Sequence, residues 1–157
     1  MRALLQRVNR AEVRVDGRAV AAIGPGLLVL LGVGQEDDEF VAAAMAAKVA
    51  GLRIFADSEG LTNLSIGDVA GEAMVVSQFT LYADARRGRR PSFVTAAGPV
   101  VGERLYEVFC EVLRSLKVPV RQGSFGAHMD VELVNDGPFS VWLDSDELGI
   151  APRAAGA

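Results

Sequence analysis

An uninterrupted apolar run at residues 27–31, Leu-Leu-Val-Leu-Leu, constrains the fold of this chain more than any other feature. It lacks the alternation of apolar and polar residues found in a strand with one solvent-exposed face, so it predicts a central strand that is covered on both faces. Residues 4–15 before it form the pattern of a long strand, and Asp16-Gly17 is a two-residue hairpin signal that leads into a return strand at 18–23. We therefore expect the core to be built around residues 27–31.

Two segments have the periodicity of helices that pack one face against a core. The first follows Asp37 and Asp38, which favour a helix N-terminus, and ends at Gly51, the expected C-cap. The second begins after Gly98-Pro99 and is ended by Pro119. Further strands are expected at 52–55, 61–66, 73–81 and within 120–143. This order of elements predicts a soluble α/β or α+β domain.

Composition narrows the class of protein. The chain has 157 residues, 50% of them hydrophobic, so it can bury a core without disulfides or a structural metal. Its net charge of -4 means that any polyanion must be bound locally. No apolar run approaches the ~18 residues of a membrane span, and no leader pattern precedes the first strand. The single Cys110 is expected to be a buried apolar group, so we expect a cytoplasmic protein without membrane contact.

The chain shows no linker and no internal repeat, and it divides only near its end. We expect one domain over residues 1–145. Residues 146–157 are rich in Ala, Gly and Pro and have little periodicity, so they are expected to form a flexible C-terminal tail.

The hexapeptide at residues 135–140, Asn-Asp-Gly-Pro-Phe-Ser, lies between two strand-like segments at 129–134 and 141–143. A Gly-Pro step is unusual there, because proline cannot donate to a sheet and glycine adds no side chain to pack. Two interpretations remain open. The turn-forming residues favour a hairpin turn, whereas the poor fit to a strand favours backbone carbonyls presented to a ligand, with a cis Gly-Pro peptide.

Polar side chains appear abruptly at the end of the buried strand that starts at residue 73. Ser77, Gln78 and Thr80 supply two hydroxyls and an amide. A hydroxyl nucleophile ordinarily needs a base beside it, and no sequence cue links the only histidine, His128, to these residues. The alternative is that the hydroxyls satisfy strand-end backbone groups. No His, Cys, Asp or Glu set has metal-ligand spacing, so no metal is expected.

A basic loop follows this strand end and contains four arginines, which are Arg86, Arg87, Arg89 and Arg90. The loop has the phosphate-binding chemistry that the rest of the surface lacks, although a solvated loop is the alternative. A glycine-rich phosphate cradle is not indicated, because Gly32-Val33-Gly34 is followed by an acidic stretch at 35–39 where a phosphate would lie. A polyanion would therefore be bound at the arginine loop.

Four motifs follow one another along the chain: Leu5-Gln6-Arg7-Val8, Ser77-Gln78-Phe79-Thr80-Leu81, Arg90-Pro91-Ser92-Phe93, and Asn135-Asp136-Gly137-Pro138 with Trp142-Leu143. In order and spacing they resemble those of the D-aminoacyl-tRNA deacylases of bacteria and eukaryotes. The resemblance extends from Met1 to about Asp144. It implies an α+β fold with a single domain, a barrel-like, mostly antiparallel mixed sheet and two main helices.

The resemblance also implies an activity. Members of this family hydrolyse the ester that links a D-amino acid, or glycine mischarged on tRNA-Ala, to the terminal adenosine of tRNA. They are homodimers with a site at each end of the interface and use neither a metal nor an organic cofactor. Catalysis in the family relies on the 2′-hydroxyl of the terminal ribose, which agrees with the lack of a histidine base. Rivals are a tRNA- or DNA-binding module without turnover and a small-molecule esterase that uses His128.

Residue roles follow from the same resemblance. The catalytic group would be Ser77, Gln78, Phe79 and Thr80, in which Gln78 and the amides around Phe79 polarise the ester carbonyl and Ser77 supports them. The terminal adenine would contact Phe125 and Met129, and the tRNA would contact the four arginines of the loop.

Selectivity is assigned to Gly137 and Pro138, whose cis peptide would enter the partner's site and exclude L-side chains by collision. The supporting residues would be Gln6, Arg7, Asn135 and Ser140, with Arg7 holding the gate carbonyls in place. This chain departs from the family pattern at two positions beside the gate. Ser140 stands where threonine is usual, and Phe139 replaces a smaller aliphatic residue.

Overall fold

Strand β1 (Arg2–Val15) is the axis of the fold in the computed structural model, which describes residues 1–153. One edge of β1 pairs along its whole length with β8 (Asp130–Asp144). The other edge pairs with β2 (Arg18–Ile23) and then with β3 (Gly26–Gly32). All three pairings are antiparallel, and the predicted hairpin at Asp16-Gly17 joins β1 to β2.

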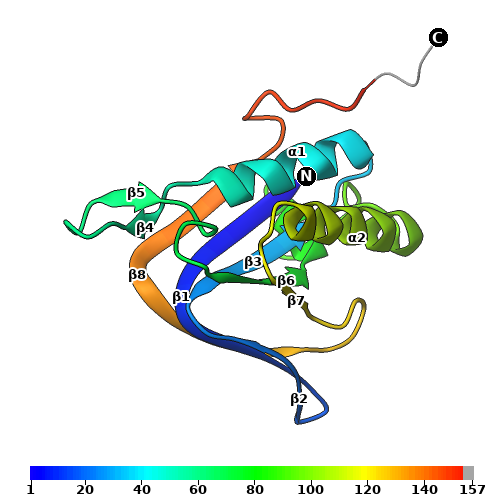
Figure 1. The fold of residues 1–157 in the computed structure, drawn as a ribbon. Helices are drawn as coiled ribbons and strands as arrows, with labels where there is room; N and C mark the ends of the chain where they lie inside the picture. Colours follow the sequence, from blue (N-terminus) through cyan, green and yellow to red (C-terminus); the bar gives the residue numbers. More distant parts are fainter. Residues whose placement is uncertain (154–157) are drawn as a thin grey trace.

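The sheet continues from β3 with parallel strands. β3 pairs with β6 (Glu72–Ser77), and β6 pairs with β7 (Val120–Gln122). The order is β2-β1-β3-β6-β7, with β8 beside β1, and the long strands β1 and β8 arch together across the molecule (Figure 1). The sheet is thus mixed and mostly antiparallel, which confirms the predicted barrel-like α+β fold.

Helices α1 (Glu39–Gly51) and α2 (Pro99–Ser115) lie side by side over one face of the sheet (Figure 1). Asp38 caps α1 by accepting a hydrogen bond from the N–H of Val41 at 2.8 Å, as the acidic pair predicts. α2 begins at the predicted proline, where a missing N–H costs nothing. Both predicted helices are therefore confirmed, each to within a few residues.

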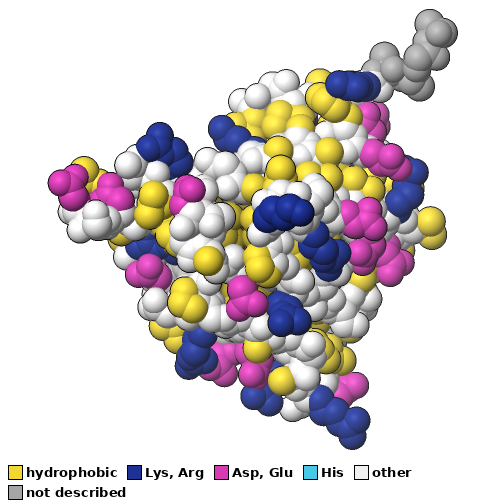
Figure 2. Space-filling model, viewed as in Figure 1, with side chains coloured by type: hydrophobic (Ala, Val, Ile, Leu, Met, Phe, Trp, Pro, Cys, Tyr) yellow, Lys and Arg dark blue, Asp and Glu magenta, His cyan; other side chains and the backbone are white. Residues whose placement is uncertain are grey.

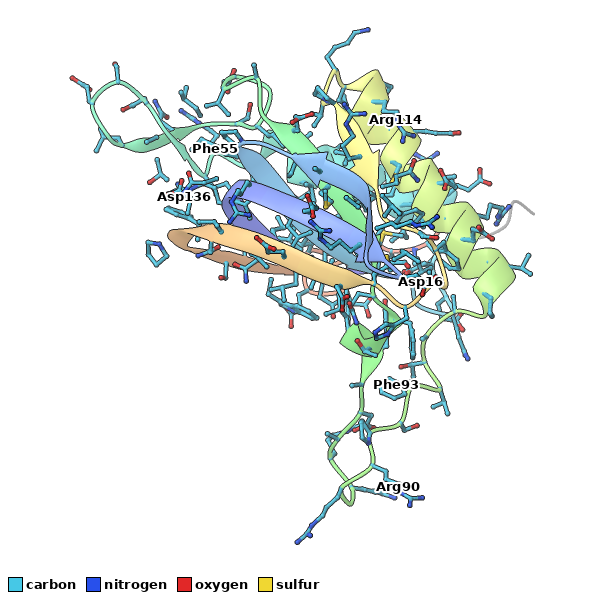
Figure 3. All side chains as sticks on the ribbon, turned by 90° about the horizontal axis from the view of Figure 1, so that it is seen from below. Asp16, Phe55, Arg90, Phe93, Arg114 and Asp136 are labelled. Carbon is cyan, nitrogen blue, oxygen red and sulfur yellow. The ribbon has the colours of Figure 1, made fainter. Side chains whose placement is uncertain are left out.

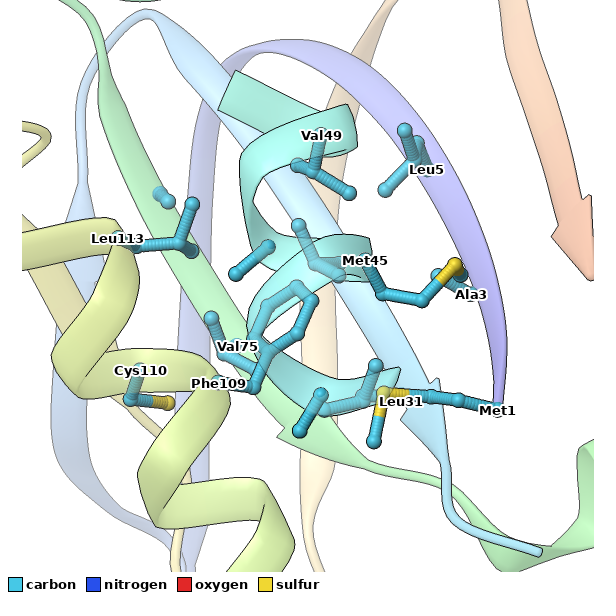
Figure 4. Packing of buried hydrophobic residues seen from close by; sticks show 14 of the residues in the cluster. Met1, Ala3, Leu5, Leu31, Met45, Val49, Val75, Phe109, Cys110 and Leu113 are labelled. Atoms are coloured by element: carbon cyan, nitrogen blue, oxygen red, sulfur yellow. The ribbon is translucent and has the colours of Figure 1, made fainter. Parts of the chain in front are cut away.

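The core has two parts, one on each face of β3. Leu27, Val29 and Leu31 pack with the helices, whereas Leu28 packs in a second cluster on the other face of the sheet. Figure 4 shows Phe109 of α2 pointing into the space between α1 and β6. The apolar run is thus covered on both faces, as its lack of alternation predicted.

Cys110 is completely buried in the helix-side cluster, which confirms its expected place in the core. Burial, and secondly the nearby Glu107 carboxylate, raise the pKa of its thiol to about 12, and Arg114 offsets only part of this effect. The side chain therefore behaves as a small apolar group.

Strands β4 (Phe55–Ala56) and β5 (Thr62–Leu64) form a separate two-stranded arm that projects from the molecule (Figure 1). The predicted strands at 52–55 and 61–66 are thus present but shorter. The arm touches the sheet through Arg7, whose Nη1 donates to the carbonyl of Ile54 at 2.5 Å.

The hairpin interpretation of residues 135–140 is wrong. Both halves of β8 pair with the same strand, since Asn135 lies opposite Val8 and Ser140 lies opposite Gln6. The chain therefore continues in one direction instead of reversing. Between these pairs β1 advances two residues and β8 advances five, so the Asp-Gly-Pro-Phe segment bulges out of the ladder.

The described part of the predicted tail packs back onto the domain. Ile150 packs against the helix-side core, and its N–H donates to the carbonyl of Ser145 at 2.8 Å. The N–H of Arg153 donates to Asp38 Oδ2 at 2.8 Å. Residues 154–157 lie outside the described residues, so the flexibility expected for this tail stays a prediction.

Candidate active site

An apolar cavity of about 400 Å³ lies where β6 ends. Ser77, Gln78 and Phe79 lie along one side of it, and Tyr106 and Phe125 line it from α2 and from the loop after β7. The rings of Tyr106 and Phe125 are 5.8 Å apart between centroids. A cavity of this size, mostly apolar and with a few polar groups at its edge, suits the apolar body of a small ligand.

Gln78 follows β6 and precedes a single 3-10 turn, η1 (Phe79–Tyr82), which contains Thr80. The N–H of Gln78 still bonds to the carbonyl of Leu31 at 2.7 Å, and its side-chain amide donates to the Thr80 hydroxyl. Within the described residues, the N–H groups of Phe79 and Thr80 have no hydrogen-bond partner. Two unpaired donors at the start of a turn can receive a carbonyl oxygen.

Aromatic side chains shape the edge of the cavity. Phe79 is 58% exposed, and its ring meets that of Phe93 edge to face at 5.2 Å. Deeper in, the Tyr106 hydroxyl donates to the carbonyl of Val75 at 2.8 Å. Burial raises the pKa of Tyr106 above its usual value, so the phenol stays neutral and serves as a fixed wall.

The residues predicted to hold the adenine are separated by the fold. Phe125 lines the cavity, but Met129 packs against the second core cluster, on the face of the sheet away from the helices. Met129 also covers Gly123, where an added Cβ would come within 2.8 Å of the methionine sulfur. The predicted catalytic residues, by contrast, are together, although Thr80 is exposed beside the cavity rather than lining it.

The bulge on β8 contains a cis peptide bond between Gly137 and Pro138. Arg7, only 9% exposed, contacts the residues on either side of this peptide bond. Its Nε lies 3.2 Å from the carbonyl oxygen and 2.8 Å from the carboxylate of Asp136, and its guanidinium stacks 4.0 Å from the ring centre of Phe139. Arg7 thus fixes the residues on both sides of the Gly-Pro step.

The other predicted supporting residues also lie at the bulge. Ser140 Oγ donates to Gln6 Oε1 at 2.5 Å, which joins the end of the bulge to β1. An added Cβ on Gly137 would meet only the Asn135 side-chain amide, at 3.1 Å. The hydroxyl that the sequence retains at position 140 is therefore engaged in a hydrogen bond.

Within one chain, the bulge and the cavity lie apart. Ser77 pairs with Leu31, Leu31 with Ala3, and Ala3 with Leu143. This register puts β8 three strand spacings from β6, about 14 Å, and Gly137 lies six residues further along β8. Figure 3 shows Asp136 and the cavity residue Phe93 at different parts of the molecule.

The arginine loop projects beyond the cavity, with Arg90 near its tip (Figure 3). Arg86 donates to both carboxylate oxygens of Asp84, at 2.8 and 2.6 Å. These hydrogen bonds hold the pKa of Asp84 well below its usual value. No ion pair or side-chain hydrogen bond within residues 1–153 involves Arg87, Arg89 or Arg90.

Elsewhere the surface mixes charges of both signs, as Figure 2 shows for one face. His128 is exposed in the loop before β8 and does not line the cavity. Among the described residues, no three His, Cys, Asp or Glu side chains gather as metal ligands. No helix in residues 1–153 is long and apolar enough to span a membrane. Independence from metals and cofactors stays a prediction.

Comparison with known proteins decides the family. Residues 4–144 match the family model described as D-Tyr-tRNA(Tyr) deacylase. The chain belongs to this deacylase family. A D-aminoacyl-tRNA deacylase of Thermomicrobium roseum is 60% identical over 148 residues, covering 94% of this chain and 96% of that protein. Another, from Deinococcus radiodurans, is 55% identical over 144 residues, covering 92% and 99%.

Solved structures agree with this deacylase fold. One titled c-Myc DNA Unwinding Element Binding Protein has a TM-score of 0.87 and 39% identity, covering 92% of this chain and 99% of that one. A probable eukaryotic D-amino acid tRNA deacylase has a TM-score of 0.77 at 18% identity, covering 90% and 97%, and supports the fold alone. The predicted family and enzyme class, drawn from the four motifs, are confirmed.

Sequence reasoning missed two residues in or near this candidate site, Tyr106 and Arg2. Tyr106 fits the pattern of an ordinary amphipathic helix, yet it lines the cavity with its ring. A tyrosine among the apolar residues Leu105 and Phe109 indicates that its hydroxyl has a buried hydrogen-bond partner, which is here the Val75 carbonyl. Arg2, which contacts the end of η1, gave no sequence signal because its partners are distant in the chain.

Proposed function

We propose that this chain hydrolyses the ester bond of D-aminoacyl-tRNA and releases the free D-amino acid and tRNA. Family membership supports the activity, since the similar curated proteins carry the name D-aminoacyl-tRNA deacylase. The observation that carries the proposal for this chain is the pair of unpaired N–H groups at Phe79 and Thr80. They lie beside Gln78 at the edge of an apolar cavity. Acyl transfer needs donors of this kind.

The proposed substrate lies with its terminal adenine in the cavity, against Phe125 and Tyr106, and its ester at η1. The N–H groups of Phe79 and Thr80 stabilise the negative charge that develops on the carbonyl oxygen. The 2′-hydroxyl of the terminal ribose assists attack of water on the carbonyl carbon. The new C–O bond forms, the bond to the 3′-oxygen breaks, and that oxygen leaves with a proton. Ser77 and Gln78 position the ester.

The selectivity for D-esters is assigned to the cis Gly137–Pro138 bulge. Because the bulge is distant from the cavity of its own chain, a gate at that cavity must come from a second copy. We therefore propose a homodimer in which each bulge enters the partner's site. Two backbone carbonyls there collide with an L-side chain and leave room for hydrogen or a D-side chain, so glycyl-tRNA mischarged on tRNA-Ala is also a substrate. Arg7 keeps the bulge rigid.

The tRNA is held by the arginine loop, with Arg87, Arg89 and Arg90 offering charges that the described part of the chain does not neutralise. The reaction is placed in the cytoplasm, where aminoacyl-tRNA is made. The protein's own groups and the RNA supply all of the proposed chemistry, without a cofactor.

The test is deacylation of matched D-Tyr-tRNA and L-Tyr-tRNA by the purified chain with chelator present. Loss of the D-ester with the L-ester spared is the expected result. Loss of both would mean that no gate forms, and loss of neither would refute the proposed activity. Gly137→Ala is expected to fold, because its added methyl meets only a flexible side chain, and to lose selectivity or rate. His128→Ala is expected to retain the activity, whereas an esterase that used this histidine as its base would lose it.

A second candidate is binding of nucleic acid without turnover. It is favoured by the arginine loop and by the solved structure whose title names a DNA unwinding element binding protein. Its prediction is salt-sensitive binding of tRNA or DNA by a chain that leaves D-Tyr-tRNA intact. The same deacylation assay therefore separates the two candidates.

A further inference from the structure

The turn η1 lies directly against the backbone at the end of β3 and just after it. An added Cβ on Gly34 would come 2.6 Å from the Tyr82 hydroxyl oxygen, and one on Gly32 would come 3.0 Å from the carbonyl oxygen of Gln78. A side chain at either glycine would push the turn away from the sheet. The position of η1 is therefore set by contacts outside the cavity as well as by its own hydrogen bonds.

Arg2 fastens the far end of this turn. Its Nη1 donates to the carbonyl of Leu81 at 3.0 Å, and its Nε donates to Asp144 Oδ2 at 2.8 Å. Its guanidinium carbon lies 4.5 Å from the ring centre of Tyr82 and 5.9 Å from that of Trp142. Because the donors of arginine form a rigid planar fork, these contacts together fix one orientation.

A comparable pair farther along the same strands is much more exposed. The side chains of Arg2 and Asp144 are 32% and 9% exposed, whereas those of Arg10 and Glu132 are 58% and 59% exposed. Exposed pairs of the second kind constrain structure weakly, because both partners are well hydrated and mobile. The chain thus contains a shielded arginine–carboxylate pair at η1 and a matched exposed pair away from it.

We propose that Arg2 is a positioning residue for ester hydrolysis, acting through the Leu81 carbonyl to hold the N–H groups of Phe79 and Thr80 where the ester oxygen is received. The N–H of Leu81 closes the same turn onto the carbonyl of Gln78 at 3.2 Å, so movement of Leu81 is passed to the start of the turn. Arg2 does not line the cavity. The inference rests on the proposed function of this turn.

The test compares kcat and KM for D-Tyr-tRNA in the wild-type chain, Arg2→Lys and Asp144→Asn. Lysine keeps the charge but cannot hold both acceptors and stack on the ring, so the turn is less fixed. A displacement of the order of 1 Å in a reacting geometry costs about 100-fold. We expect kcat of Arg2→Lys to fall by about 10- to 100-fold with KM within about two-fold, because the adenine cavity is untouched. Asp144→Asn should show a smaller fall of the same kind.

Arg10→Lys, on the same strand, is the control and should leave kcat unchanged. Folding of each variant is followed by Tm and by the emission of Trp142, the only tryptophan. A folded Arg2→Lys with wild-type kcat would overturn the inference, and so would a rise in KM at constant kcat. If Arg2→Lys does not fold, Asp144→Asn decides by the same criteria. A wild-type chain that leaves D-Tyr-tRNA intact would instead refute the proposed function itself, and the inference with it.

Discussion

Replacing Arg7 by lysine tests whether one buried guanidinium keeps the Gly-Pro bulge rigid. The guanidinium donates to the carbonyl of Ile54 at 2.5 Å and to that of Asp136 at 3.2 Å, and it stacks at 4.0 Å on Phe139. The ammonium group of lysine can occupy only one of these positions and does not stack in the same way. The bulge and the β4–β5 arm would then have no common anchor.

The size of the effect follows from the interactions that lysine cannot make. A hydrogen bond from a charged donor contributes about 1.5–3 kcal/mol, and a cation–π contact of this kind about 0.5–1 kcal/mol. The ion pair with Asp136 adds little, because that carboxylate is 45% exposed. We expect Arg7→Lys to lower the free energy of unfolding by about 2–4 kcal/mol. For a chain of this length that is a fall in Tm of about 4–16 °C.

Function should change with stability. A gate loosened by about 1.4 kcal/mol lets the rejected ester react about ten times faster. We therefore expect Arg7→Lys to hydrolyse L-Tyr-tRNA at least about ten-fold faster relative to D-Tyr-tRNA than the wild-type chain does. The measurements are thermal unfolding at fixed protein concentration and deacylation of the two esters well below Tm.

Arg53→Lys is the matched control for this experiment. Arg53 also donates to a carbonyl, that of Asn63 in the same arm, but it is exposed, so its replacement should change Tm by about 2 °C or less. The reasoning is refuted if Arg7→Lys behaves like Arg53→Lys in both assays. A fall in Tm with unchanged selectivity would refute only the link between the anchor and the gate.

Three further predictions concern other parts of the chain. Arg87→Gln should make the fall of log affinity for tRNA with log salt less steep by about 0.7–0.9. Asp84→Asn, which frees Arg86, should raise the affinity for tRNA at low salt, and titrations at several salt concentrations measure both effects. Cys110 should resist iodoacetamide at pH 8, where a pKa of about 12 leaves about 10⁻⁴ of the thiols ionised; mass spectrometry that finds rapid alkylation of the native chain would contradict this. Leu105→Ala, at a fully buried position, should lower the free energy of unfolding by about 2–5 kcal/mol in urea titrations, and a change under about 1 kcal/mol would mean that the site collapses without a cavity.

Much of the fold could be read from local patterns, because those patterns are set by neighbours in the chain. The apolar run at 27–31 predicted a strand covered on both faces, and Asp38 and Pro99 marked the starts of the two helices. The lengths of the short arm strands were predicted less accurately, since the ends of these strands depend on their pairing with each other.

The hairpin interpretation of the Gly-Pro segment failed for a physical reason. Turn-forming residues report local backbone preference, but the direction of the chain after them depends on which strand the next segment pairs with. Here β1 is long enough to pair with both halves of β8, so Asn135 and Ser140 are held on one ladder and the residues between them bulge out. That choice is made by β1, more than a hundred residues away.

The sequence by itself determined the family, the central strand, the two helices and the identity of the polar residues at the end of β6, because each motif or pattern is formed by residues close together in the chain. Tertiary structure alone decided what surrounds them. It brought Tyr106 and Phe125 to the cavity, moved Met129 to the other face of the sheet, and set Arg2 against Leu81. These contacts join residues from separate elements, so they exist only once the curl of the sheet and the register of its strands are fixed.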